Sequence, residues 1–182
     1  MSLSPIKRLI IETMWMLDKP AKAAEIAKET RLGFPSVMMH IIGLARMGYL
    51  ESPQKGYYAI TEKGRKVLGF PETNNEKAAE ILAYLPIEKS FYFYADLGKP
   101  LNIHASSLQD FSDKILKIDT GAVEFHINRG DFEAWFMGLG DIELTRKTLL
   151  IKEKGMLGEE LREKLYEVVK NRCDELAKLR KA

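Results

Sequence analysis

Apolar residues recur every three or four positions along most of the chain, which is the spacing of one face of a helix. The first such stretch predicts a helix over residues 5–17, with Pro5 in its first turn. Two further helices are expected, one over 23–30 and one from Phe34 onward that Gly48 ends. The N-terminal part of the chain is therefore expected to begin as three short helices.

An alternating pattern replaces the helical spacing after the third helix. Short strands are expected over 49–51 and 57–60, and the Pro- and Gly-containing turn between them indicates a β-hairpin. Thr61 is expected to cap a further helix over 62–68. The next segment, 71–75, is dense in turn-forming residues and predicts a linker.

The rest of the chain is expected to be mostly helical, with a small two-stranded sheet. Strands are predicted over 91–95 and 122–127, because apolar and polar residues alternate there, and a loop over 96–105 follows the first strand. The remaining elements are helices over 76–85, from Ser106 or Ser107 to 118, from Gly130-Asp131, from Asp141 to near Gly155, and over 158–180. The predicted fold class is therefore α+β.

Charge changes along the chain together with these elements. We expect a domain over 1–70, a linker and connecting helix over 71–87, and a second α+β domain over 88–182. Residues 1–70 hold 11 Lys and Arg against 6 Asp and Glu, whereas residues 71–182 hold 17 against 20. The basic first domain fits a surface that binds anions such as nucleic acid, although chance alone can give an excess of this size.

Two segments of the basic domain resemble known proteins. Residues 36–50, which end in Gly48-Tyr49-Leu50, resemble the recognition helix and first wing strand of winged-helix transcription regulators. Residues 57–66 contain the pattern Tyr-x-Ile-Thr-x-x-Gly and resemble the second wing strand and following helix of the MarR and PadR families. The resemblance covers residues 4–70. It implies a winged helix-turn-helix domain, three helices plus a β-hairpin wing, that binds duplex DNA.

The resemblance assigns DNA contacts to two groups of residues. The N-terminal half of the third helix would enter the major groove, with these residues near the bases: Ser36, Met38, Met39 and His40. Basic side chains on neighbouring elements would contact the DNA backbone, namely Lys22, Arg31, Lys55 at the wing tip, Lys63 and Arg65.

Met38 and Met39 depart from the pattern of related regulators, which carry Ser, Arg, Lys or Gln at these reading positions. Methionine cannot form the bidentate hydrogen bonds that distinguish base pairs, so it can only touch thymine methyl groups or pack against protein. The expected function is a DNA-binding transcriptional regulator with a C-terminal domain for sensing or assembly. The alternative is a winged-helix protein-interaction adaptor without sequence-specific DNA binding.

The second domain resembles a domain found in uncharacterised prokaryotic proteins. The run 124–135 carries this resemblance, together with Phe91-Tyr92-Phe93 and the helix start at 107–111, and it spans about residues 88–180. The resemblance implies no activity.

The two strands predicted in the second domain also suggest a pocket. If they pair, one face carries Tyr92, Tyr94, Glu124 and His126, which could line a small-molecule pocket. Alternatively, that face is solvated or covered by a helix.

The final helix aligns Leu161, Leu165, Val168, Arg172 and Leu176 along one stripe. The stripe either packs on its own domain or forms the interface of a homodimer. We expect a homodimer, because winged-helix regulators usually bind paired half-sites. Any small-molecule or protein effector stays unidentified.

Other classes of function find no support in the residues. The three histidines are isolated and no glycine-rich phosphate loop follows a strand, so we expect no enzyme activity, no cofactor and no metal. Cys173 is the only cysteine, which excludes an internal disulfide. No apolar run approaches the roughly 20 residues of a membrane span and no signal peptide is evident, so a cytoplasmic protein without a membrane partner is expected.

Overall fold

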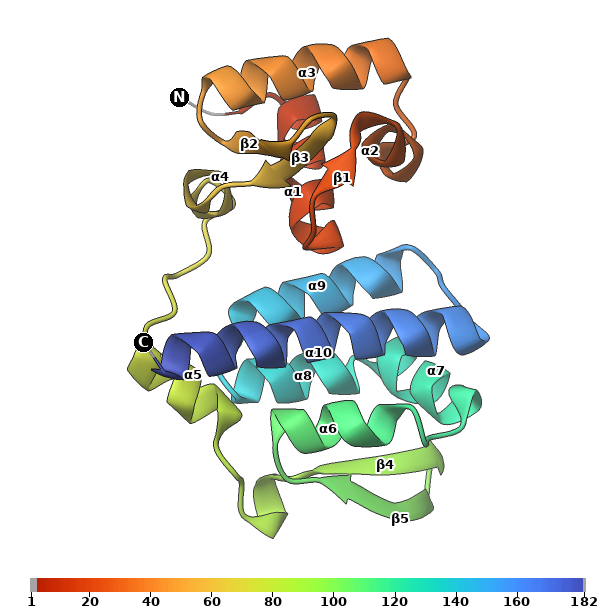
Figure 1. The fold of residues 1–182 in the computed structure, drawn as a ribbon. Coiled ribbons are helices and arrows are strands. Elements are labelled where there is room, and N and C mark those ends of the chain that lie inside the picture. Colours follow the sequence, from red (N-terminus) through yellow and green to blue (C-terminus); the bar gives the residue numbers. More distant parts are fainter. Residues whose placement is uncertain (1–2, 182) are drawn as a thin grey trace. The chain divides into compact units, whose positions relative to one another are not determined.

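The computed structural model describes residues 3–181 and has an α+β fold of helices and two small antiparallel sheets (Figure 1). The chain divides into two compact units, Met1–Glu72 and Thr73–Ala182. No helix within the described residues combines the length and the apolar character that crossing a membrane requires.

The first unit has the predicted order of three helices, a hairpin and a further helix. One short strand was not predicted, because a two-residue strand has no recognisable period. The elements are α1 (Pro5–Leu17), β1 (Ala21–Lys22), α2 (Ala23–Thr30), α3 (Phe34–Arg46), β2 (Leu50–Gln54), β3 (Tyr57–Ile60) and α4 (Glu62–Lys66). Strand β3 lies between β1 and β2 and runs antiparallel to both.

The core of the first unit lies between the helices and the sheet. It is formed by the apolar stripes that predicted the helices, and each of these side chains is fully buried: Ile10, Ile11, Met14 and Trp15 of α1, Ile26 of α2, and Val37, Ile41 and Leu44 of α3. Burial of each such side chain contributes about 1.5–3 kcal/mol. These stripes therefore fix which face of α3 is left for solvent.

The Tyr-x-Ile-Thr-x-x-Gly pattern has a structural explanation in the turn from the hairpin to α4. The hydroxyl of Thr61 accepts a hydrogen bond from the backbone N–H of Gly64 and donates one to the carbonyl of Gly48, at 3.1 and 2.7 Å. A Cβ atom at Gly64 would collide with the carbonyl oxygen of Tyr49. The threonine and the glycine thus hold α4 against the end of α3.

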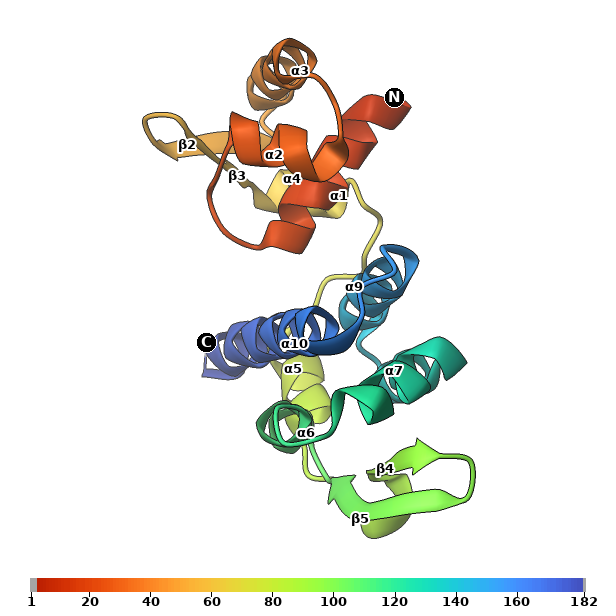
Figure 2. The ribbon, with the colours of Figure 1, turned by 90° about the vertical axis from the view of Figure 1, so that its right-hand side faces the viewer.

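The second unit is a group of helices around α10, with a two-stranded hairpin at its edge. Its elements are α5 (Asn75–Leu82), the 3₁₀ turn η1 (Ile87–Lys89), β4 (Phe91–Asp96), β5 (Lys99–Ala105), α6 (Leu108–Ile115), α7 (Thr120–Arg129), α8 (Asp131–Gly138), α9 (Ile142–Glu153) and α10 (Gly158–Lys181). Helix α10 contacts α5, α6, α7 and α9, and α7 contacts β4 (Figure 2).

The segment predicted as a second strand, 122–127, is a helix. Asp119 caps α7 by accepting a hydrogen bond from the N–H of Gly121 at 2.8 Å, and Gly130 ends it with a φ of 78°. The buried residues of α7 are Ala122, Val123, His126 and Ile127, a helical spacing that a six-residue window does not distinguish from alternation.

The segment predicted as a loop, 96–105, contains the second strand instead. Strand β5 pairs antiparallel with β4, with Phe91 opposite Ala105 and Tyr92 opposite His104. The register shifts twice along the pair, and Asn102 has a φ of 56°. The turn-forming residues that suggested a loop are therefore part of an irregular hairpin.

The stripe of the final helix packs within its own unit, the first of its two predicted roles. Leu161, Leu165, Val168, Arg172 and Leu176 are all buried on α10, whose neighbours in the second unit are α5, α6, α7 and α9. This stripe therefore offers no surface for a second copy, and the expected homodimer stays a prediction without an assigned interface.

Arg172 makes the main polar contact of the stripe. Its guanidinium donates to both carboxylate oxygens of Asp141, from Nε at 2.8 Å and from Nη2 at 3.1 Å. The Asp141 side chain is 0% exposed and also accepts from the N–H of Leu144 at the start of α9. Burial lowers the pKa of Arg172, but Asp141 and the nearby Glu143 and Glu175 outweigh burial and raise it. The pair is thus a charged contact between α9 and α10.

Candidate functional site

The first candidate surface is the outward face of α3. The helix has 13 residues and begins with Phe34 and Pro35 after Gly33. Its inner face is buried, whereas Phe34, Met39 and Ile42 remain 52%, 62% and 45% exposed. Because residues three, four and seven positions apart share one helix face, Met39 and Ile42 form an apolar strip with Pro35 and Met38. The side of α3 that faces solvent is therefore mainly apolar.

The four residues predicted to face the bases differ in their exposure. Met39 is exposed, whereas Ser36, Met38 and His40 are half-buried. Met39 is thus the only one of the four whose side chain stands largely free of its own unit.

Basic side chains occupy both ends of α3 and the tip of the hairpin. Arg31 caps the end of α2, just before α3, in the left-handed conformation with a φ of 57°. Arg46 lies in the last turn of α3, and Lys55 lies next to Gly56 in the turn between β2 and β3. All three side chains are exposed. The apolar strip is accordingly bordered by positive charge.

Two of the lysines predicted to contact phosphate have partners within the first unit. The ammonium of Lys22 lies 5.3 Å from the ring centre of Tyr57. The ammonium of Lys63 donates to the carbonyl of Met47 at 2.8 Å and lies 5.2 Å from the ring centre of Tyr49. Lys63 therefore neutralises the negative end of α3. Arg65 of α4 is half-buried. Among residues 3–181, no such contact is found for the two remaining exposed predicted cations, Arg31 and Lys55.

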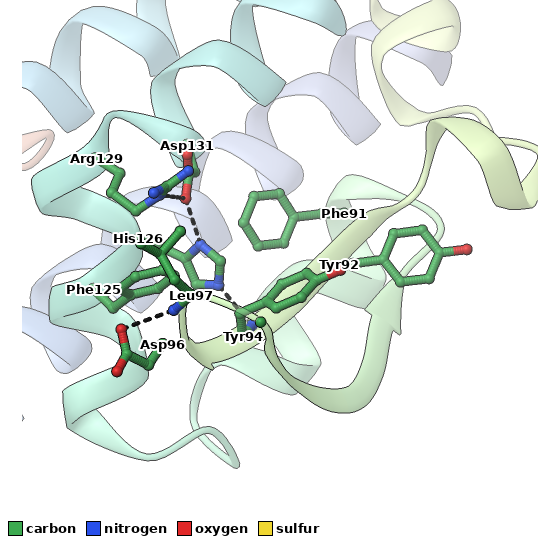
Figure 3. Close-up of a pocket in the computed structure, with 10 residues that line it drawn as sticks. Phe91, Tyr92, Tyr94, Asp96, Leu97, Phe125, His126, Arg129 and Asp131 are labelled. Atoms are coloured by element: carbon green, nitrogen blue, oxygen red, sulfur yellow. Dashed lines mark hydrogen bonds and ion pairs between the residues drawn. The ribbon is translucent and has the colours of Figure 1, made fainter.

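The second candidate site is a pocket of about 260 Å³ between the β4–β5 hairpin and α7 (Figure 3). Its walls are mostly aromatic or apolar, with an arginine and two carboxylates among them. The lining residues are Phe91, Tyr92, Tyr94, Asp96, Leu97, Gly98, Phe125, His126, Arg129 and Asp131.

His126 connects three elements at the base of this pocket. Its Nε2 atom accepts the backbone N–H of Tyr94 in β4 at 2.8 Å, and its Nδ1 atom lies 2.8 Å from Oδ2 of Asp131 in α8. An amide N–H can only donate, so Nε2 carries no proton and Nδ1 donates to the carboxylate. Burial lowers the pKa of His126, although Asp131 opposes this effect. The imidazole is therefore a neutral link between β4, α7 and α8.

Arg129 lies beside the same carboxylate, as Figure 3 shows. Its Nε atom donates to Oδ2 of Asp131 at 3.1 Å, and its guanidinium lies 5.1 Å from the ring centre of Phe125. The side chain is 47% exposed. Neither Arg129 nor Asp131 was expected to line a pocket, yet both do.

Three of the four residues predicted to line a pocket line this one, and Glu124 does not. Tyr94 and His126 line the pocket, and Tyr92 lines it with its ring pointing away from His126 (Figure 3). The hydroxyl of Tyr92 donates to the carbonyl of Ile87 at 2.8 Å. The prediction for Glu124 is wrong. Its carboxylate accepts the N–H of Gly158 at 2.6 Å at the start of α10, because 122–127 is a helix and not a strand.

The described residues offer neither a metal site nor a reactive cysteine. Among residues 3–181, no three His, Cys, Asp or Glu side chains gather closely enough to hold a metal ion. Cys173 is buried, and burial raises the pKa of its thiol to about 12. A thiol of this kind is not a nucleophile at neutral pH.

Comparison with protein-family models, with curated proteins and with solved structures found no match to this chain.

Proposed function

We propose that the first unit binds duplex DNA through α3 and the β2–β3 hairpin, and that the chain acts as a transcriptional regulator. The observation that carries this proposal is the exposed face of α3 with Arg31, Arg46 and Lys55 around it. A helix of 13 residues is about 20 Å long at ~1.5 Å per residue and fits the major groove. The second unit would then serve sensing or assembly.

The polar contacts available to this face indicate how DNA would be held. Arginine and lysine bind phosphate groups, whereas the apolar strip cannot form the hydrogen bonds that read base edges. Affinity should therefore come mainly from the DNA backbone, with release of counterions. Binding of this kind weakens steeply as salt rises, in proportion to the number of phosphates contacted.

The test is a fluorescence-anisotropy titration of a random duplex at about 50 and 200 mM salt, the range in which phosphate contacts have a large effect. The variant Arg46→Glu/Lys55→Glu should bind at least about tenfold more weakly, because two phosphate contacts become repulsive. The control Lys178→Glu/Arg180→Glu makes the same charge change at exposed positions of α10 and should bind as the parent does. Equal loss in both variants, or binding insensitive to salt, would contradict the assignment to this face.

A second candidate is a protein-interaction adaptor, and the exposure of Phe34, Met39 and Ile42 favours it. Exposed apolar strips on soluble domains often mark protein contacts. The titration separates the two functions, since an adaptor of this kind would leave the random duplex unbound even at low salt.

A further inference from the structure

The apolar strip of α3 matches one chemical feature of the major groove. Base edges there present hydrogen-bond donors and acceptors, and the only apolar group is the C5 methyl of thymine. An apolar side chain placed over a polar edge removes water without replacing its hydrogen bonds, which is unfavourable. The same side chain placed over a methyl group buries apolar surface on both partners. The strip would thus favour methyl groups over all other groups in the groove.

The length of the strip sets how many base pairs it could read. From Pro35 to Ile42 the helix rises about 10 Å at ~1.5 Å per residue. Successive base pairs are ~3.4 Å apart, so the strip spans about three to four of them. Arg31 and Arg46 lie near the two ends of this span, where a groove-bound helix meets the phosphates. This charge is complementary to a polyanion such as duplex DNA and not to a neutral apolar protein surface.

We propose that α3 selects duplexes by the C5 methyl groups of pyrimidines, with Met39 and Ile42 as the main contacts; this inference rests on the DNA-binding function proposed above. Sites rich in thymine would then be preferred without any hydrogen bond to a base. Each methyl buried contributes about fourfold in affinity, the equivalent of ~0.8 kcal/mol. Two or three contacts therefore predict a preference of more than about tenfold.

Replacement of thymine by uracil provides the test, because it removes the methyl group and leaves every hydrogen-bonding group in place. An A·T-rich duplex and its counterpart with deoxyuridine at every thymidine would be titrated by anisotropy at one salt concentration. The uracil duplex should bind at least about tenfold more weakly. In a G·C duplex, 5-methylcytosine in place of cytosine should strengthen binding by a similar factor.

The possible outcomes separate this inference from the proposed function. Salt-sensitive binding that is equal for the thymine and uracil duplexes would overturn the methyl preference and leave DNA binding intact. Failure to bind any duplex would overturn both. The variant Met39→Gln should reduce the thymine-to-uracil ratio, whereas Leu9→Gln, a similar change at an exposed position of α1, should leave it unchanged. An unchanged ratio in Met39→Gln would remove the preference from this face.

An independent observation concerns the pocket beside His126. Arg129 is fixed from two sides, by Asp131 at its Nε atom and by the ring of Phe125 at its face. Among the described residues, its two terminal nitrogens have no hydrogen-bond partner. Asp131 is already paired with Arg129 and His126, and Asp96 is paired with Lys99 at 3.3 Å. The carboxylates of the pocket are thus compensated, whereas the outer part of the guanidinium is not.

We infer that the pocket binds a small carboxylate with a flat apolar body. The terminal nitrogens of Arg129 would donate to the carboxylate, a pairing for which a guanidinium has the right geometry. The body would lie against Phe91, Phe125 and Leu97. A volume of about 260 Å³ limits the ligand to the size of a substituted aromatic acid.

The probes are benzoate and benzamide, which share a ring and differ in charge. Benzoate should cause saturable shifts of the backbone amide signals of Tyr94 and Leu97 in NMR spectra, and benzamide should bind at least about tenfold more weakly, because it lacks the charge-assisted pair. Arg129→Met should abolish the difference, and Arg146→Met, a change in α9, should preserve it. Equal affinity for the two probes in the parent protein, or no saturable shift, would overturn this inference.

Discussion

Replacing Arg172 by methionine is expected to lower the free energy of unfolding of the second unit by about 3–5 kcal/mol. The substitution leaves the carboxylate of Asp141 fully buried without its guanidinium partner. Of the hydrogen bonds that this carboxylate accepts from Arg172 and Leu144, only the one from the N–H of Leu144 remains. A buried charge that loses its partner is costly, because one remaining hydrogen bond replaces only part of the hydration it gave up. Few single substitutions outside the apolar core would have a comparable effect.

The two tryptophans allow this effect to be measured in one unit at a time. Trp15 belongs to the first unit and Trp135 to the second. In a Trp15→Phe background, urea unfolding followed by Trp135 fluorescence reports the second unit alone. This separation matters because a protein of two units need not unfold in one step.

The matched control for Arg172 lies two residues earlier on the same helix. Lys170 and Asp174 form an exposed ion pair at 2.6 Å, so Lys170→Met should cost no more than about 1 kcal/mol. Asp141→Asn in the Arg172→Met background should recover part of the lost stability, since it removes the unpaired charge. Similar losses for Arg172→Met and Lys170→Met would show that the buried pair contributes no more than an exposed one.

His126→Ala is expected to destabilise the second unit by about 3–4 kcal/mol, from a cavity and from an unpaired N–H at Tyr94. The side chain is 3% exposed and contacts the rings of Phe91 and Phe132. His104→Ala is the control, because His104 is half-buried beside Tyr92, and it should cost about 1 kcal/mol or less. A comparable loss in both variants would contradict the linking role of His126.

The same residue predicts a dependence of stability on pH. Burial lowers the pKa of His126 in the folded protein below the usual value of 6.5, and its Nε2 atom has no room for a proton while it accepts from Tyr94. The unfolded chain therefore takes up a proton first as the pH falls. The stabilising contribution of His126 is complete above pH 6.5 and is lost below it. Urea unfolding at pH 8 and pH 5.5 should show this loss in the parent and less of it in His126→Ala.

Local signals predicted the first unit well because they agree with one another there. The stripe of α1, the turn residues of the hairpin and the cap at Thr61 each specify the element that forms. The short strand β1 escaped prediction, because its pairing with β3 depends on the tertiary fold. The sequence also did not predict how exposed each side chain of α3 is. Met39 is exposed, whereas its neighbour Met38 is half-buried.

The pocket of the second unit was predicted from a wrong premise. Tyr94 and His126 do meet, but His126 comes from a helix and reaches the edge of β4 through its ring nitrogen. A strand would have placed Glu124 on the same face, whereas in α7 Glu124 lies about 200° around the helix from His126 at ~100° per residue. The sequence signals that are consistent with α7 lie at its two ends, where Asp119 caps the helix and Gly130 ends it in the left-handed conformation.

The central position of α10 affects the order in which the two units can fold during synthesis. Helices α5, α6, α7 and α9 bury their apolar faces against α10, which follows all of them in the chain. The internal contacts of the first unit are all available once residue 72 has emerged from the ribosome, so this unit can fold during synthesis. The second unit keeps these helices without their partner until Leu176 has been added and released. During that interval the nascent chain consists of a folded first unit followed by helices whose apolar faces are exposed. Chaperones bind intermediates of this kind.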